Sequence, residues 1–241
     1  MIADFRLALG FLTRIPVSLA EPPGPNALTR SMRLFPLVGA LIGAAVGGLD
    51  LLAGKVLPPL PSALLAIGLG LLLTGALHED GLADCADGFG GGRDKDGKLA
   101  IMRDSRIGAY GTLALILSVG LRASAIAQTA NPAGALIAAH AVSRALLPGL
   151  MVFLPPASAT GLAASAGRAG KADFLIALAL AILLTVPLLG FWLIPVLGTA
   201  ALVFAAMALL ARRQIGGYSG DVLGALQQTC EIAVLLAILA R

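Results

Sequence analysis

One stretch of the chain gathers most of the residue types that carry chemistry. It runs from His78 to Gly111 and reads HEDGLADCADGFGGGRDKDGKLAIMRDSRIGAYG. Seven of the thirteen carboxylates of the protein lie in it, together with five lysines and arginines and a run of glycines. Acids that bind a metal ion, followed by glycines and bases that bind phosphate, form the inventory expected of phosphoryl transfer.

The acids have a helical spacing. If residues 79–88 form a helix, Asp80, Asp84 and Asp87 stand at positions i, i+4 and i+7 and share one face. Like charges in one stripe oppose helix formation unless a cation neutralises them. Oxygen ligands without a histidine–cysteine cluster favour Mg²⁺ or Mn²⁺ over zinc, so we expect these carboxylates to bind Mg²⁺. Gly81 and Gly88 flank the stripe and would let a phosphorylated substrate approach the backbone.

The residues that follow suit phosphate. In GFGGG, Gly90 and Gly91 permit positive φ angles and exposed backbone N–H groups. Arginine side chains match phosphate oxygens bidentately. The basic residues expected to hold phosphate are Arg93, Lys98, Arg103 and Arg106. The alternative is that the acidic and basic residues form a solvated loop that binds nothing.

The elements that must position these residues are membrane helices. Of all residues, 58% are hydrophobic and 12% charged, and the mean hydropathy is +0.93, which indicates an integral membrane protein. The apolar runs of roughly 20 residues that could cross a bilayer are Phe35 to Ala53, Leu57 to Leu77, Gly108 to Ala130, Ala133 to Leu154 and Val222 to Ala240. A longer uncharged run, Phe174 to Ala211, contains Pro187, Gly190 and Pro195 and predicts two helices joined by a tight turn.

The sequence therefore predicts an all-α bundle of about seven transmembrane helices. Continuous Leu- and Ala-rich runs favour helices over a barrel, whose strands alternate in polarity. No repeat is visible, so residues 1–241 are expected to form one membrane-embedded domain. The first twenty residues are typical of an amphipathic or re-entrant segment and not of a cleavable signal peptide.

Lysine and arginine predict the orientation, because they are enriched in cytoplasmic loops. With the N-terminus inside, thirteen of the seventeen fall in cytoplasmic segments, Arg122 and Arg144 fall within spans, and Lys55 and Arg241 fall outside. The stretch from His78 to Gly108 is then cytoplasmic. The net charge of +4 reflects this topology and attraction to the inner leaflet, and it does not indicate binding of nucleic acid.

A few polar residues stand outside the main stretch. Glu231 lies inside the last span, where an acid is either functional or paired with Arg122 or Arg144. Asp221, after GGYSG, is either a site residue or a helix N-cap. For Asp50 and His140, single polar residues within spans, we expect hydrogen bonds between helices. Cys85 and Cys230 show no CxxC spacing, so neither a disulfide nor a zinc site is expected.

Several sequence motifs together resemble those of a known protein family. HEDGLADCADGFGGG followed by IMRDSRIGAYG resembles the signature of the cobalamin synthase family, the adenosylcobinamide-GDP ribazoletransferases. Further motifs agree in order along nearly the whole chain: FLTRIPV, FPLVGALIG, SRALLP and GGYSGDVLGA.

The resemblance implies a Mg²⁺-dependent enzyme of the cytoplasmic (inner) membrane of a prokaryote, with its active site facing the cytoplasm. The implied substrates are adenosylcobinamide-GDP and α-ribazole or its 5'-phosphate. Attack of the riboside hydroxyl on the corrinoid-side phosphorus would release GMP and form adenosylcobalamin or its 5'-phosphate. Association with other cobalamin-assembly enzymes and the oligomeric state are left open.

The resemblance also implies roles for the residues. Asp80, Asp84 and Asp87 would hold one or two Mg²⁺ at the pyrophosphate, with Mn²⁺ as a substitute. Asp104 would be a metal ligand, a base for the riboside hydroxyl, or a salt-bridge partner of a neighbouring arginine, and His78 either a structural cap or a substrate contact. The residues implied in substrate binding are Arg93, Lys98, Arg103, Ser105, Arg106, Gly90, Gly91 and Asp221.

Two other classes of protein share part of this pattern. A CDP-alcohol phosphotransferase also uses helical acids in a membrane bundle, but its motif has an arginine soon after DGxxA and aspartates at G-x3-D-x3-D spacing. DGLADCADGFGGG departs from that pattern. A cation transporter could line a path with the same acids, but it would place them near the membrane midplane and would not need the basic loop.

Overall fold

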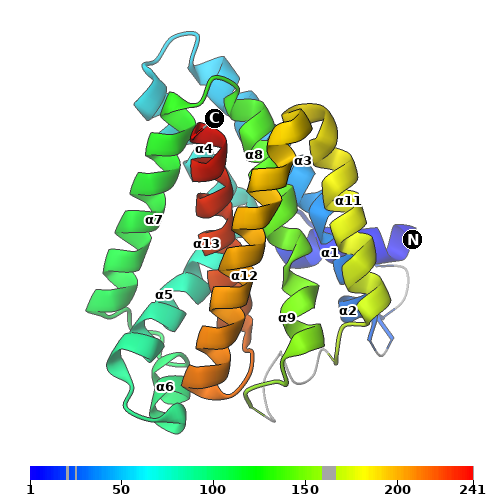
Figure 1. The fold of residues 1–241 in the computed structure, drawn as a ribbon, viewed down its shortest axis with the longest axis vertical. Coiled ribbons are helices and arrows are strands. Elements are labelled where there is room, and N and C mark those ends of the chain that lie inside the picture. The colour runs from blue at the N-terminus through cyan, green and yellow to red at the C-terminus, as the bar shows by residue number, and fades with distance from the viewer. Residues whose placement is uncertain (20–21, 25, 159–166, 241) are drawn as a thin grey trace.

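The computed structural model of the chain describes residues 1–19, 22–24, 26–158 and 167–240. This part of the chain is helical, and its only β-type pairing is one isolated bridge between Pro156 and Tyr218. The long helices run side by side along the molecule (Figure 1). The predicted all-α class is confirmed. The helices are α1 Ile2–Leu12, α2 Ala27–Ser31, η1 Met32–Leu34, α3 Phe35–Ala53, α4 Pro59–Thr74, α5 Leu77–Gly91, α6 Lys95–Ile101, α7 Ala109–Gln128, α8 Pro132–Ala145, α9 Leu147–Phe153, α11 Lys171–Leu189, η2 Gly190–Trp192, α12 Leu193–Ile215 and α13 Gly220–Leu239.

Within the described ranges, five segments are long and apolar enough to cross a membrane, or six if the bent pair α4 and α5 counts as one. The longest of the five, Lys171–Ile215, contains both α11 and α12. These two helices fold back on each other at η2, where Gly190 has a φ of 55° (Figure 1). The predicted break near Gly190 is therefore confirmed. The predicted count of about seven is therefore approximate, since the described segments number five or six when the hairpin of α11 and α12 counts as one.

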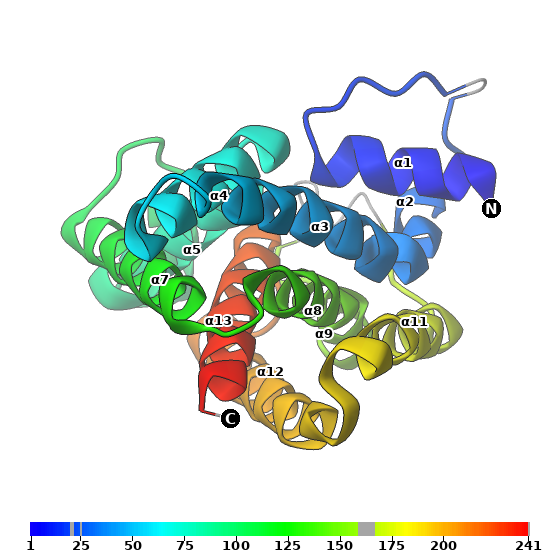
Figure 2. The same cartoon turned by 90° about the horizontal axis from the view of Figure 1, so that it is seen from above.

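Close contact between α3 and α8 forms the middle of the bundle, where Figure 2 shows α8 beside α3. Gly39, Gly43 and Gly47 recur every four residues along α3 and face the backbone of α8. A Cβ atom at Gly43 would lie 2.6 Å from the Ile137 Cα, and one at Gly47 would lie 2.8 Å from the Ala133 Cα. Small residues at this spacing let membrane helices approach closely, where dispersion forces replace the missing hydrophobic effect.

The chain between α4 and α5 bends by 92°. The bend falls at Gly75 and Ala76, which have φ angles of 64° and 56° and end α4 in the left-handed conformation. The prediction that residues 79–88 are helical is confirmed, and this helix begins after the bend instead of extending α4 in a straight line. Because Gly75 tolerates the left-handed region at no steric cost, α4 stops there and α5 starts in a new direction.

The N-terminal helix α1 lies across the outer side of the bundle, beyond α3 (Figures 1 and 2). Its eleven residues are too few to cross a bilayer, as predicted. Asp4 on its inner face is buried and accepts hydrogen bonds from Arg30 at 3.0 Å and from Arg33 at 2.6 Å. Phe11 stacks on Phe35 of α3 with ring centroids 5.9 Å apart. Ion pairs with α2 and η1 and an aromatic contact with α3 thus hold α1 against the bundle.

Candidate active site

Residues of α5, α6 and the start of α13 line a cavity of about 310 Å³. These elements lie towards the same end of the bundle (Figure 1). Asp80 of α5, Arg103 after α6 and Asp221 of α13 line the cavity. The bridge between residues 155–157 and 218 shapes its rim, since Tyr218 donates to the Pro155 carbonyl at 2.9 Å and Ala157 donates to the Tyr218 carbonyl at 2.8 Å. The cavity therefore joins the predicted acidic stretch to the second polar patch near the C-terminus.

Glycine contacts hold α5 against α13 at this point. A Cβ atom at Gly81 would lie 2.9 Å from the Asp221 carbonyl oxygen and 3.2 Å from the Gly224 Cα. Gly224 in turn lies against the backbone of His78. The expectation that Gly81 leaves room for substrate is wrong, because α13 occupies that space. Gly88 is likewise packed against α6, where an added Cβ would lie 3.1 Å from the Lys98 carbonyl oxygen.

Four carboxylates from two helices act on one another near the cavity. The charges of Asp80, Asp221 and Asp87 all act on Asp84, and those of Asp80 and Arg103 act on Asp221. Ser219 caps α13 by accepting from the Val222 backbone N–H at 3.2 Å, so the N-cap is Ser219 and not Asp221. Asp221 accepts a hydrogen bond from Ser219 Oγ at 3.2 Å and lines the cavity, and its role as a site residue stays a prediction.

Asp87 has a different environment from the other two acids of its stripe. It is buried and accepts hydrogen bonds from the backbone N–H groups of Gly108 at 2.7 Å and of Gly111 at 2.9 Å. Since these groups open α7, Asp87 serves in this structure as a cap for the start of that helix. Its assignment as a metal ligand stays a prediction.

The donor set fits a hard divalent cation in type. Asp80, Asp84 and Asp221 supply oxygen atoms, and their mutual repulsion would be relieved by a cation. Within the described residues, no three His, Cys, Asp or Glu side chains converge closely enough to hold a metal ion. The fit therefore rests on donor chemistry alone.

The glycine run does not form the expected loop. Gly90 and Gly91 belong to the last turn of α5, and neither has a positive φ angle. A Cβ atom at Gly90 would lie 2.7 Å from the Tyr110 ring, and one at Gly92 would lie 2.7 Å from the Lys98 Cα. The prediction of a left-handed phosphate loop is wrong, because these glycines are used for close packing against α6 and α7.

The basic residues separate into those at the cavity and those away from it. Arg103 lines the cavity and donates to Ser158 Oγ at 3.2 Å. Arg93 is exposed in the turn after α5 and is not part of the cavity wall. Lys98 donates to the Gln214 side chain and so joins α6 to α12. Ser105 is exposed in the segment between α6 and α7.

Asp104 and Arg106 bind each other. The Arg106 guanidinium contacts the Asp104 carboxylate at 2.6 Å, and the Arg106 backbone N–H donates to it at 3.1 Å. Hydrogen bonds from the Arg106 side chain and backbone lower the pKa of Asp104 to about 2. Of the three roles predicted for Asp104, the structure shows the salt bridge with a neighbouring arginine.

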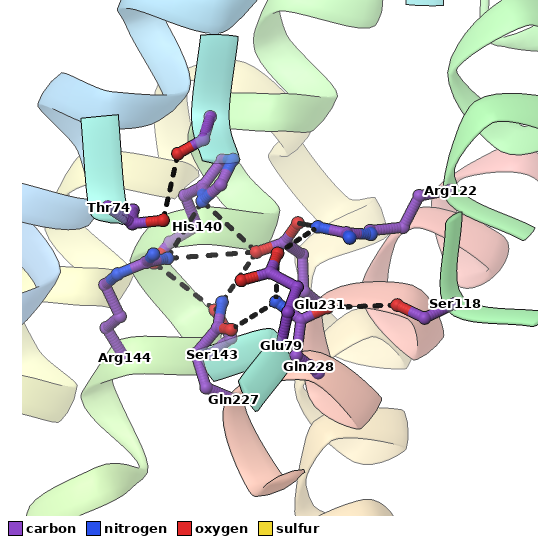
Figure 3. Close-up of polar contacts among 11 residues, drawn as sticks. Thr74, Glu79, Ser118, Arg122, His140, Ser143, Arg144, Gln227, Gln228 and Glu231 are labelled. Carbon is purple, nitrogen blue, oxygen red and sulfur yellow. Dashed lines mark hydrogen bonds and ion pairs between the residues drawn. The ribbon is translucent and has the colours of Figure 1, made fainter. Parts of the chain in front are cut away.

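A second polar cluster lies in the bundle interior (Figure 3). Arg122 of α7 donates to Glu79 at 3.1 Å and to Glu231 at 3.3 Å. The other Glu231 oxygen lies 3.2 Å from His140 Nδ1 and 3.8 Å from Arg144 Nη1 of α8. The pairing predicted for Glu231 is confirmed with both arginines.

Amide and hydroxyl side chains complete this cluster. Gln227 donates to Glu231 at 2.6 Å, and Gln228 donates to Glu79 at 3.0 Å. Ser118 donates to Gln228 at 3.0 Å (Figure 3). The predicted helix–helix role of Asp50 is also confirmed, since Ser62 of α4 donates to its Oδ1 at 2.8 Å.

His78 lies between the cavity and the buried cluster, lining the space beside each. Its neighbour Glu79 enters the cluster, and Asp80 enters the cavity. The sequence motifs assigned no role to Glu79 or Gln227. The signal that could have found them is the presence of Gln227, Gln228 and Glu231 within one apolar span, because such groups need partners in a membrane.

Comparisons with known proteins identify the family of the chain. A family model described as cobalamin-5-phosphate synthase matches residues 4–239. A curated protein of Bradyrhizobium diazoefficiens named adenosylcobinamide-GDP ribazoletransferase is 47% identical over 100% of this chain and 94% of its own length. One of the same name from Azorhizobium caulinodans is 45% identical over 99% of this chain and 96% of its own. No solved structure matches. The chain belongs to the cobalamin-5-phosphate synthase family.

Proposed function

We propose that the protein is a Mg²⁺-dependent adenosylcobinamide-GDP ribazoletransferase of the inner membrane. It joins α-ribazole, or its 5'-phosphate, to adenosylcobinamide-GDP and releases GMP. The observation that carries the proposal is the cavity lined by Asp80, Asp221 and Arg103 in a chain of this family. It brings acids and a guanidinium together at the point where the family motifs HEDGLAD and GGYSGD meet.

The reaction balances with groups at the cavity. The riboside hydroxyl oxygen forms a bond to the corrinoid-side phosphorus, and the bond from that phosphorus to the bridging oxygen breaks. GMP leaves with the bridging oxygen, and the hydroxyl proton passes to a carboxylate. We assign the proton to Asp221, which faces the cavity from α13, and assign Arg103 to the phosphate oxygens.

Asp80 and Asp84 are the residues that would hold Mg²⁺, with Mn²⁺ as a substitute. When bound, the ion supplies positive charge that stabilises the departing phosphate. Asp80 lines the cavity, and Asp84 lies one turn further along α5. Asp87 already accepts two backbone hydrogen bonds at the start of α7, which supports a structural role for it beside any contact with the ion.

We place the cavity on the cytoplasmic side. The segments at that end, from α5 to α7 and from α12 to α13, carry Arg93, Lys95, Arg103 and Arg212, whereas Lys55 lies in the loop between α3 and α4 at the other end (Figure 1). Excess positive charge marks cytoplasmic loops. Arg241, predicted outside, falls beyond the described residues.

One assay tests the proposal. Purified protein in liposomes should release GMP and form a cobamide when given adenosylcobinamide-GDP, α-ribazole and Mg²⁺. Product from a CDP-alcohol and an acceptor alone would instead support the phosphotransferase alternative. Transport of cations without GMP release would support the transporter, which the cavity at the end of the bundle disfavours.

A further inference from the structure

Most of the cavity wall is apolar, although its functional groups are charged. Beyond Asp80, Arg103 and Asp221 the lining includes Phe11 of α1, Met32 of η1 and Met151 of α9. The charged groups all come from α5, α13 and the segment after α6, and these elements together with α6 also supply apolar residues such as Leu77, Leu99 and Leu223. The N-terminal helices, the start of α3 and α9 supply only apolar residues. The cavity thus has a charged part and an apolar part, which suits a ligand with the same division.

Two stacked aromatic rings form part of the apolar wall. Phe11 and Phe35 both line the cavity, and their rings are stacked with an interplanar angle of 14°. Phe11 reaches the cavity wall because α1 packs against the bundle. The buried Asp4 holds α1 there through its hydrogen bonds with Arg30 and Arg33. A helix that neither spans the membrane nor carries a reacting group is therefore held in place as a wall of the cavity.

The chemistry of the two substrates decides what this wall would contact. The corrin macrocycle carries amide arms around its edge and exceeds a cavity of about 310 Å³, a volume at the lower end of the range for small-molecule pockets. Guanine presents amino and carbonyl groups that need hydrogen-bond partners when buried. The base of α-ribazole is a flat, carbon-rich bicyclic ring with a single acceptor nitrogen beyond its glycosidic bond.

We propose that the cavity binds α-ribazole, with its benzimidazole-type base against Phe11, Phe35, Met32 and Met151 and its ribose toward Asp80 and Asp221. This inference rests on the proposed function and names the substrate that occupies the site. Methionines adapt to the face of an aromatic ring, and sulfur–aromatic contacts are favourable. The arrangement brings the riboside hydroxyl to the carboxylates while the corrinoid approaches from outside the cavity.

Binding of α-ribazole without the corrinoid is the primary test. Calorimetric titration of α-ribazole into the wild-type protein in lipid nanodiscs gives the reference Kd. Met151→Ala removes apolar contact and should raise the Kd by about tenfold, equivalent to 1.4 kcal/mol. Leu28→Trp, at a partly exposed position of the wall, fills the cavity without hollowing the core and should also raise it. Met207→Ala, in α12 and away from the cavity, is the matched control and should leave the Kd unchanged.

Steady-state kinetics of the same variants separate the two substrates. Met151→Ala and Leu28→Trp should raise the KM for α-ribazole and leave the KM for adenosylcobinamide-GDP within about twofold of the wild type. A wild-type protein that also prefers a dimethylated over an unsubstituted benzimidazole riboside, by about tenfold, would support burial of the ring, since each buried methyl contributes about 0.8 kcal/mol.

The outcomes distinguish this inference from the proposed function. If the wild type releases GMP but the cavity variants bind α-ribazole as well as Met207→Ala does, the inference is wrong and the function stands. A rise confined to the KM for adenosylcobinamide-GDP would assign the cavity to the other substrate and overturn the inference. Absence of GMP release by the wild type would overturn the function, and the inference with it.

Discussion

Arg122 donates a hydrogen bond to Glu231 across 3.3 Å in the interior of the helix bundle, and both side chains are almost fully buried. The contact joins α7 to α13, and Glu79 extends it to α5. These three helices also carry or adjoin the cavity carboxylates. The stability of the membrane core and the geometry of the site therefore depend on the same ion pairs.

Removing one partner of this cluster should be costly. Arg122→Met leaves Glu79 and Glu231 as buried charges without their shared partner, and we expect a loss of about 3–5 kcal/mol in the free energy of unfolding. Adding Glu231→Gln should recover part of that loss. Equilibrium unfolding in mixed detergent micelles measures both. Arg106→Gln, which breaks only the exposed pair with Asp104, is the control and should not change stability. Equal losses for Arg122→Met and the control would contradict the prediction.

Replacement of Asp84 and replacement of Asp87 should have different effects, the first on activity and the second on the start of α7. Asp84→Asn should abolish GMP release at every Mg²⁺ concentration while the protein stays folded. Asp87→Asn keeps only one carbonyl oxygen for two backbone donors, so it should increase hydrogen exchange at Gly108 and Gly111. Near-normal rates of Asp84→Asn at saturating Mg²⁺ would remove Asp84 from the metal ligands.

Arginine variants should reflect distance from the cavity. Arg103→Ala should lower kcat/KM for adenosylcobinamide-GDP by 10²-fold or more, on the order expected for loss of a charged donor to a reacting phosphate. Arg103→Lys should lose less, because the charge remains but the bidentate geometry does not. Arg93→Ala should have a small effect, since Arg93 is exposed outside the cavity wall. The kinetics of GMP release measure these losses. A larger loss for Arg93→Ala than for Arg103→Ala would place the phosphates at the turn after α5.

Thiol labelling tests the orientation in the membrane. Cys85 and Cys230 are buried, so an introduced cysteine should dominate the reaction with an impermeant reagent. Lys95→Cys should react in inverted vesicles and resist labelling in intact cells. Lys55→Cys, exposed in the loop between α3 and α4, is the matched control and should show the opposite pattern. Labelling of Lys95→Cys from outside would reverse the proposed topology.

The attachment of α1 should depend on ionised Asp4. Burial raises the pKa of Asp4, but hydrogen bonds from Arg30 and Arg33 outweigh burial and hold the pKa below its ordinary value. The carboxylate therefore stabilises the folded state above an unfolded-state pKa of about 3.9, and this contribution is lost as the pH falls through the lowered value. The protection of the α1 amides against hydrogen exchange, relative to an unfolded chain, should stay constant near neutral pH. Asp4→Asn should lower this protection there. Unchanged protection in Asp4→Asn would show that apolar packing alone holds α1.

The sequence was informative where local rules decide the structure. Apolar length and the Pro187–Gly190 break predicted the helices and their hairpin, and the spacing of Asp80, Asp84 and Asp87 predicted a helix. Glu231 could be paired with an arginine in advance, because a membrane interior leaves few alternatives.

Tertiary contacts decided the rest. Glycines that favour loops when read alone were used for close approach, as at Gly81 against α13 and Gly90 against Tyr110. No local pattern distinguishes a glycine that needs a positive φ from one that needs a near neighbour. The engagement of Asp87 by Gly108 and Gly111 and the joining of Asp80 to Asp221 depend on contacts between distant segments, which one sequence does not reveal.

The bend at Gly75 and Ala76 has a consequence for how the chain can vary. Glu79 and Asp80 are neighbours in the sequence, yet one belongs to the buried ion pairs and the other to the cavity wall. The residue at which α5 starts therefore fixes the directions in which both side chains point around the helix axis. One residue inserted or deleted between the bend and Glu79 would turn α5 by about 100°, moving an acid out of each position together. A change of length at this junction should therefore disturb the buried ion pairs and the cavity wall together.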